Sequence, residues 1–215
     1  MHRTSRKLVV RFLGFLLSLL LLFRSATAAP PKEADFRRVT DWLWLLAGAA
    51  TGFVAHEGGH LLLDLAAGTK PELHKVTLGP FPFFAIQPTV TDLSPRLRYA
   101  IPAMGFAAQD LYSELILGID PRLREHHHPF LKGMLGFHAV LSVGYAITGF
   151  AAIGPAQSDV NSMARALQVP PWAIGMMILV PAGCDVYRYF VPDSRWAPWV
   201  SLSAKLTTIG AIAAF

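Results

Sequence analysis

Residues 42–67 read WLWLLAGAATGFVAHEGGHLLLDLAA, and this stretch decides the fold. Its length and low charge are enough for a helix that crosses the ~30 Å hydrocarbon core of a bilayer. The tryptophans at its start are typical of the membrane–water interface. Within the run stand His56, Glu57 and His60, ionisable side chains that are costly in lipid unless they pair or serve a function. The stretch therefore predicts a membrane helix that carries a functional site.

The composition of the whole chain agrees with a membrane protein. Of 215 residues, 53% are hydrophobic and 15% are charged, whereas soluble domains carry about 25% charged residues. The formal net charge of +5 arises from Lys and Arg that lie mostly between apolar runs, where such residues set membrane topology. Because no basic stretch alternates with aromatic residues, we expect no nucleic-acid partner. Cys184 is the only cysteine, which excludes a cysteine-based zinc site.

The N-terminal segment has the features of a secretory signal sequence over residues 1–29. A basic start is followed by an apolar run and by the small-x-small pattern Ala26-Thr27-Ala28. An uncleaved anchor helix is the alternative, because the apolar run approaches spanning length. Either interpretation leaves residues 30–41 as a polar linker on the outer face. Residues 42–215 then form a single integral membrane domain.

Five apolar segments of this domain are predicted to cross the membrane, since each is near the ~20 residues that a spanning helix needs. Between the first two, the segment 76–90 contains Pro80, Pro82 and Pro88, which forbid a helix. A short membrane-associated β-hairpin or extended segment is expected there. The predicted fold is thus an all-α polytopic membrane protein with about five transmembrane helices after a signal sequence. The spans are 42–67, 97–119, 130–153, 172–190 and 196–215.

The motif His56-Glu57-Gly58-Gly59-His60 carries the chemistry. Because positions four apart share one helical face, His56 and His60 can offer two imidazole nitrogens to one metal ion. In zinc hydrolases this spacing supplies two ligands, and the adjacent glutamate is a general base for water. Gly58 and Gly59 weaken a helix by about 1 kcal/mol each. Their predicted use is the close approach of another helix or of a substrate backbone.

A tetrahedral Zn²⁺ needs a third protein ligand and an open position. If residues 30–41 are outside, His60 lies toward the inner end of its span. The third span also ends on the inner side, shortly before Asp159, which is therefore the predicted third ligand. Asp110 and His138 lie nearer the middle of the membrane and remain alternatives. Asp159 also suits the N-cap of a following helix.

Residues 48–112 resemble the site-2 protease family of intramembrane zinc metalloproteases. The histidine motif, followed by Gly68, resembles the first motif of the family, and the proline-rich segment resembles its membrane-associated β-hairpin. The run from Ala103 to Gln109 resembles the helix in which the family has Ala-Gly-Pro and then Asn, with Phe106 in place of that Pro. Pro155-Ala156-Gln157-Ser158-Asp159 is a loose counterpart of the family motif whose aspartate completes the zinc site.

The resemblance implies a zinc-dependent intramembrane endopeptidase that hydrolyses peptide bonds in or near membrane-spanning segments. Zn²⁺ would be held by His56, His60 and Asp159, while Glu57 activates water. Membrane lipid and a membrane-protein substrate are the expected partners, in a bacterial inner (plasma) membrane. The substrate-binding residues would be Gly58, Gly59 and Gln109. The alternative is a non-proteolytic polytopic membrane protein, for binding, transport or metal handling, on the same scaffold.

Overall fold

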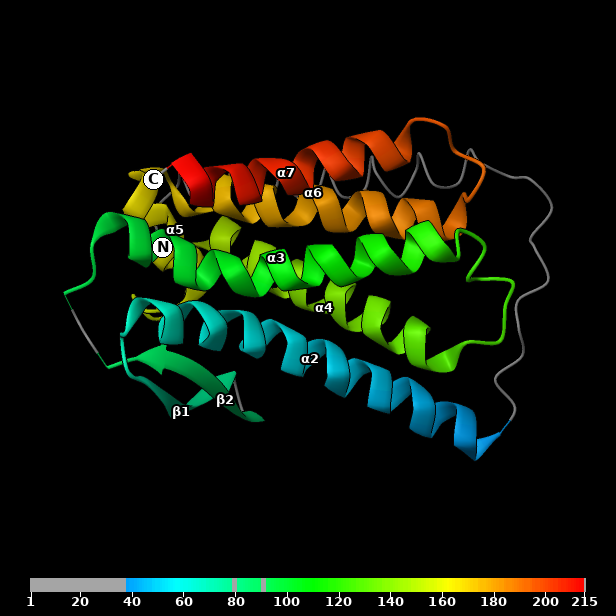
Figure 1. Cartoon of the computed structure of the whole chain (residues 1–215), viewed down its shortest axis with the longest axis horizontal. Coiled ribbons are helices and arrows are strands. Elements are labelled where there is room, and N and C mark those ends of the chain that lie inside the picture. The colour runs from blue at the N-terminus through cyan, green and yellow to red at the C-terminus, as the bar shows by residue number, and fades with distance from the viewer. Residues whose placement is uncertain (1–37, 79–80, 90–91, 215) are drawn as a thin grey trace.

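The computed structural model describes residues 38–78, 81–89 and 92–214 (Figure 1). The predicted signal sequence and most of the linker lie outside these ranges. Six helices and one two-stranded sheet occur in the described part, so the mostly helical fold is confirmed. The elements are α2 (Val39–Ala67), β1 (Pro71–Leu78), β2 (Phe81–Pro88), α3 (Pro95–Ile119), α4 (Pro129–Ala151), α5 (Asp159–Leu167), α6 (Pro171–Phe190) and α7 (Ala197–Ala214).

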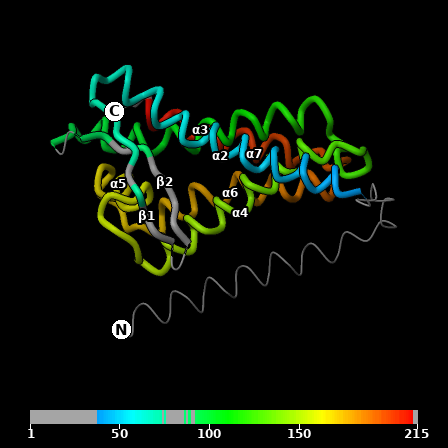
Figure 2. The backbone as a smooth tube through the Cα atoms, turned by 90° about the horizontal axis from the view of Figure 1, so that it is seen from below, coloured from blue at the N-terminus to red at the C-terminus, as the bar shows by residue number. Residues whose placement is uncertain are grey.

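The five long helices form a bundle whose members run roughly along one axis (Figure 1). Helix α2 packs against α3 and α4, α4 packs against α6, and α6 packs against α7. The short helix α5 packs against α3. In both views α5 and the β1–β2 hairpin lie at the same end of the bundle (Figures 1 and 2). This end gathers residues that are more than eighty positions apart in the sequence.

Close backbone contact holds α2 between its two neighbours. A Cβ at Gly48 would collide with the backbone carbonyl of Phe130 on α4, and a Cβ at Gly133 would collide with that of Leu45 on α2. On the other side, a Cβ at Gly59 would collide with the carbonyl of Met104 on α3. Small residues permit such approach, as they do between membrane helices. The position of α2 relative to both neighbours is therefore narrowly defined.

The helix boundaries differ from the predicted spans by three residues at most. The largest difference is at α2, which begins at Val39 and so includes the last residues of the predicted linker. Among the described residues, α4 is long and apolar enough to cross a membrane by itself. Helices α5 and α6 meet the same criterion only when taken together, as a pair bent by 116°. The five predicted spans therefore stay a prediction.

Two features near the bundle end differ from the sequence prediction. The hairpin begins at Pro71, earlier than expected, and pairs Pro71 with Pro88 in an antiparallel register. Helix α5 follows the segment for which the sequence allowed Asp159 as an N-cap, but it begins one residue earlier, with Ser158 at the N-cap. The chain leaves α4 through Ala152 and Gly154, both with positive φ, and Gly154 at φ 109° adopts a backbone conformation that favours glycine. This turn returns the chain toward α2 and places Asp159 at the first position of α5.

Candidate metal centre

His56 and His60 lie one turn apart on α2 and are both almost completely buried. Their rings are nearly perpendicular, at 89°, with centroids 4.6 Å apart. The two Nε2 atoms are separated by 3.1 Å. The helical spacing thus brings two imidazole nitrogens to one point, as the motif predicts.

The other nitrogen of each ring determines which tautomer is present. His60 Nδ1 lies 2.8 Å from the carbonyl oxygen of Ile101, which can only accept, so Nδ1 carries the proton. His56 Nδ1 lies 3.1 Å from Oε1 of Gln109 and donates in the same way. Each Nε2 is then an unprotonated acceptor, and two lone pairs face each other. A cation shared by the two nitrogens relieves that repulsion, and metal-binding histidines are fixed by such outer hydrogen bonds.

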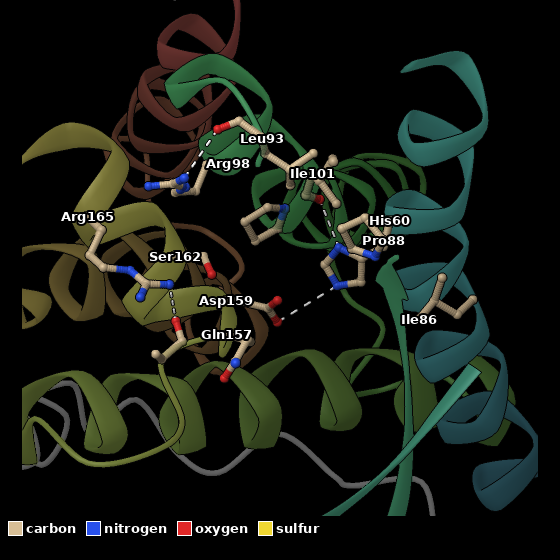
Figure 3. Close-up of a pocket in the computed structure, with 12 residues that line it drawn as sticks. His60, Ile86, Pro88, Leu93, Arg98, Ile101, Gln157, Asp159, Ser162 and Arg165 are labelled. Atoms are coloured by element: carbon tan, nitrogen blue, oxygen red, sulfur yellow. Dashed lines mark hydrogen bonds and ion pairs between the residues drawn. The ribbon is translucent and has the colours of Figure 1, made fainter. Parts of the chain in front are cut away.

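Asp159 approaches the same point from α5. Its Oδ2 lies 3.8 Å from His60 Nε2 (Figure 3). The same oxygen lies 3.7 Å from His56 Nε2. An aspartate side chain is ordinarily a carboxylate at neutral pH, so Asp159 can act as a ligand.

The spacing of the three donor atoms can be compared with a zinc site. Bonds of about 2.0–2.1 Å at tetrahedral angles put neighbouring ligand atoms about 3.3 Å apart. The observed separations of 3.1, 3.7 and 3.8 Å lie on both sides of that value. His56, His60 and Asp159 together form a group that could hold a metal ion. The donor set of two imidazoles and one carboxylate fits zinc.

Helix α3 forms the wall behind the two rings. A Cβ at Gly105 would lie 2.6 Å from His60 Nε2 and 2.8 Å from His56 Cε1, so only glycine leaves the imidazoles room. The ring of Phe106 packs edge-on against His56, with centroids 5.2 Å apart, and also against Tyr145. The histidines are thus confined by packing as well as by hydrogen bonds.

Glu57 is held by the hairpin. Its Oε2 accepts a hydrogen bond of 2.9 Å from the backbone N–H of Ile86 on β2. The side chain is part-buried, and it follows His56 directly on α2. A carboxylate next to the first histidine in the chain is therefore anchored by the hairpin without being among the three donor groups.

A pocket of about 330 Å³ opens onto this group of side chains. Ile86 and Pro88 of β2 form one wall, and His60 and Asp159 contribute to its lining. Arg98 of α3 also lines the pocket (Figure 3). The donor atoms can thus be reached from outside the bundle.

The other predicted site residues lie in different surroundings, and none of those described below lines the pocket. Gln109 is buried, contacts His56 through its amide and is not among the pocket-lining residues, so it supports a ring rather than facing the pocket. Gly59 contacts α3, whereas a Cβ at Gly58 would meet no atom within 4 Å. His138, weighed as an alternative ligand, lies instead 3.4 Å from a carboxylate oxygen of Asp185.

A second group of possible ligands lies at the opposite end of the bundle. Asp120, His126 and His128 offer ligand atoms within 4.8 Å of one another. Both histidines are exposed, and His126 Nδ1 lies 2.8 Å from Oδ1 of Asp120. His128 lines a pocket of about 370 Å³, but both histidines of this group lie at the exposed surface, whereas His56 and His60 are buried. It is the weaker candidate for a functional metal.

Three contributors to the site were not found from the sequence. The Ile101 carbonyl and Gly105 depend on the register between α2 and α3, which no sequence pattern reports. Tyr145 packs against His56, with centroids 5.9 Å apart, and its hydroxyl donates to the Asp159 carboxylate. The sequence gives Tyr145 no distinct signal, because the same span also carries other polar side chains, such as His138 and Ser142.

Comparison with protein-family models, with curated proteins and with solved structures found no match for this chain.

Proposed function

We propose that this protein is a zinc-dependent intramembrane endopeptidase that cleaves peptide bonds in or near membrane-spanning segments of other proteins. The observation that carries the proposal is the convergence of two imidazole nitrogens and one carboxylate oxygen, with a separate carboxylate, Glu57, next to His56 in the chain and anchored by the hairpin. A metal-binding protein without hydrolytic activity needs the donor atoms but not the adjacent base. The resemblance of residues 48–112 to site-2 proteases supports the same conclusion.

Each residue of the site has a distinct role in the proposed reaction. His56, His60 and Asp159 hold zinc, which supplies Lewis acidity that polarises a carbonyl and acidifies water. Glu57 accepts the proton of the attacking water and later delivers it to the leaving amine. The Ile86 N–H keeps the Glu57 carboxylate oriented between these two proton transfers.

The two outer hydrogen bonds of the histidines maintain the site between turnovers. The Ile101 carbonyl and the Gln109 amide keep the protons on Nδ1, so that both Nε2 atoms remain available as ligands. Such outer partners raise metal affinity by roughly 10–100-fold in known sites. We therefore assign Gln109 a positioning role in place of the predicted substrate contact.

The location inside a membrane is supported by the exposed surface of the bundle. At about 1.5 Å per residue, α2, α3, α4 and α6 measure about 30 to 44 Å, enough for the ~30 Å hydrocarbon core, and α7 measures about 27 Å, slightly less than that thickness. Large apolar side chains project from these helices into the surroundings, which is typical of contact with lipid. We propose that all five helices span a bacterial inner (plasma) membrane. Examples more than half exposed are Leu43, Leu46, Val54, Leu62, Leu111, Leu115, Val140, Trp199 and Leu206.

Metal content and cleavage test the proposal together. The purified full chain should contain one zinc per molecule, and His60→Ala should remove it. Glu57→Gln should keep the zinc but abolish cleavage of a panel of transmembrane segments placed between two reporter domains. Asp120→Asn is the matched control, since it alters the second group of possible ligands at the other end of the bundle. Cleavage by Glu57→Gln, or wild-type protein without metal, would refute the mechanism.

A second candidate function is ion-coupled transport, favoured by a buried charge network among α3, α4, α6 and α7. Lys205 Nζ lies 2.8 Å from Glu114 Oε2 and 2.8 Å from Asp185 Oδ2, and Arg188 also contacts Glu114. Buried ionisable groups at membrane depth often mark ion pathways. This alternative would be favoured if the protein carried cations into proteoliposomes and the Glu57→Gln variant carried them at the same rate.

A further inference from the structure

Two arginines line the pocket that leads to the metal centre. Arg98 is part-buried on α3, and Arg165 is exposed on α5. In Figure 3 both lie on the side away from Ile86 and Pro88, with Asp159 between the two sides. A substrate segment that contacts β2 and presents its carbonyl to the metal ligands therefore also passes these guanidinium groups.

Neither arginine is neutralised by the protein in the part of the chain that the structure describes. One guanidinium nitrogen of Arg98 donates to the Leu93 carbonyl at 3.2 Å, and one of Arg165 donates to the Ala156 carbonyl. No carboxylate of the described residues lies within ion-pair distance of either group, in contrast to Arg122 and Arg188. The backbone contacts fix the side chains in place while leaving their charge and further donors available.

The chemistry of a guanidinium defines the class of group it would bind. Its planar set of donors matches a carboxylate or a phosphate, and charge-assisted hydrogen bonds of this kind are among the strongest in proteins. Both arginines share their pocket with the ligands His60 and Asp159 rather than lying on the outer face of the helices. An anionic group bound to them is consequently held within a few residues of a scissile peptide bond.

We propose that Arg98 and Arg165 make the protein selective for substrate segments that carry an acidic side chain within a few residues of the cleaved bond. This inference rests on the proposed function, because it assigns the substrate class of the same site. The two arginines are specificity-determining residues, since they contact the substrate away from the reacting atoms. A phosphate of a lipid headgroup is the competing ligand that the experiment must exclude.

The test uses three short peptide hydroxamates that differ at one position, which is Glu, Gln or Lys. The hydroxamate group anchors each peptide on the metal, so that binding to the zinc-loaded full chain is measured without cleavage. We expect the Glu peptide to bind at least about tenfold more tightly than the Gln peptide, with the difference shrinking at high salt. The Lys peptide should bind most weakly.

Variants separate the arginines from general effects of charge. The double variant Arg98→Gln and Arg165→Gln should lose the preference for Glu over Gln while keeping one zinc per chain. Arg122→Gln, at the opposite end of the bundle, should keep the preference. The double change Arg98→Glu and Arg165→Glu should reverse it in favour of the Lys peptide, which a merely structural role would not produce.

The outcomes distinguish this inference from the proposed function. If wild type binds the Glu and Gln peptides equally, and His60→Ala binds neither peptide, the proposed selectivity for acidic segments is wrong. The assignment of the metal site would still stand. Absence of zinc and of hydroxamate binding would overturn both. If the Gln double variant keeps the Glu preference but retains less phosphatidylglycerol than the wild type in detergent–lipid mixed micelles, the arginines bind lipid and the inference fails.

Discussion

Replacement of Gly105 by alanine tests whether packing confines the two histidines. The added Cβ would lie 2.6 Å from His60 Nε2 and 2.8 Å from His56 Cε1, although such atoms normally stay about 3.4 Å or more apart. The rings cannot retreat freely, because Ile101 and Gln109 hold their Nδ1 atoms. Relief of the overlap therefore requires ligand shifts of several tenths of an ångström.

Such a shift is large on the scale of metal binding, where ligand distances must lie within about 0.2 Å of their proper values. Overpacking of this kind costs about 1–3 kcal/mol, which corresponds to a loss of roughly 5- to 150-fold in zinc affinity. We expect Gly105→Ala to bind zinc at least about fivefold more weakly in competition with a fluorescent chelator, while the far-ultraviolet circular dichroism stays unchanged.

Gly118→Ala is the matched control, because it lies on the same helix and its Cβ would meet no atom within 4 Å. It should bind zinc like the wild type. A zinc Kd for Gly105→Ala within threefold of the wild-type value would refute the idea that α3 confines the rings.

Three further predictions concern other parts of the molecule. Lys205→Met leaves the buried Asp185 carboxylate without its closest cationic partner, so we expect a loss of about 3–5 kcal/mol and a Tm in detergent at least about 6 °C lower; an unchanged Tm would show that the network does not need the lysine. Gly133→Ala forces α4 away from α2 and should destabilise the fold by about 1–3 kcal/mol, whereas Gly136→Ala, which faces open space, should not; equal thermal stability of the two variants would contradict the described helix contact. Tyr145→Phe removes a hydrogen bond to the carboxylate ligand and should weaken zinc binding about tenfold or more, as measured by chelator competition, with circular dichroism as the check on folding; wild-type affinity would assign Tyr145 to packing alone.

The sequence predicted the long helices well because their signal is local. Apolar runs of spanning length, bounded by tryptophan or proline, define α2, α3, α4, α6 and α7 to within three residues. Prolines likewise excluded a helix from the segment that forms the hairpin. For helix α5 the sequence offered only the possible N-cap at Asp159, because nine residues with mixed polarity between two apolar runs carry no strong helical pattern.

The residues of the candidate site likewise differ in how far a local sequence pattern could predict them. His56 and His60 converge because of helical periodicity alone, which a sequence displays directly. Asp159 was reached by a topological argument, and the structure brings its carboxylate to within 3.8 Å of both rings through the turn at Gly154. The position of Gln109 behind a ring depends on how α2 and α3 are packed. A single sequence carries no information on that register.

X-ray absorption at the zinc edge, on the purified full chain, addresses the metal centre itself. We predict one zinc per molecule with two imidazole nitrogens and at least one carboxylate oxygen at about 2.0–2.1 Å. The carboxylate signal should be lost, or the metal released, in Asp159→Ala. A chain that takes up no zinc, or a zinc bound without imidazole, would contradict the assignment of His56, His60 and Asp159 as its ligands.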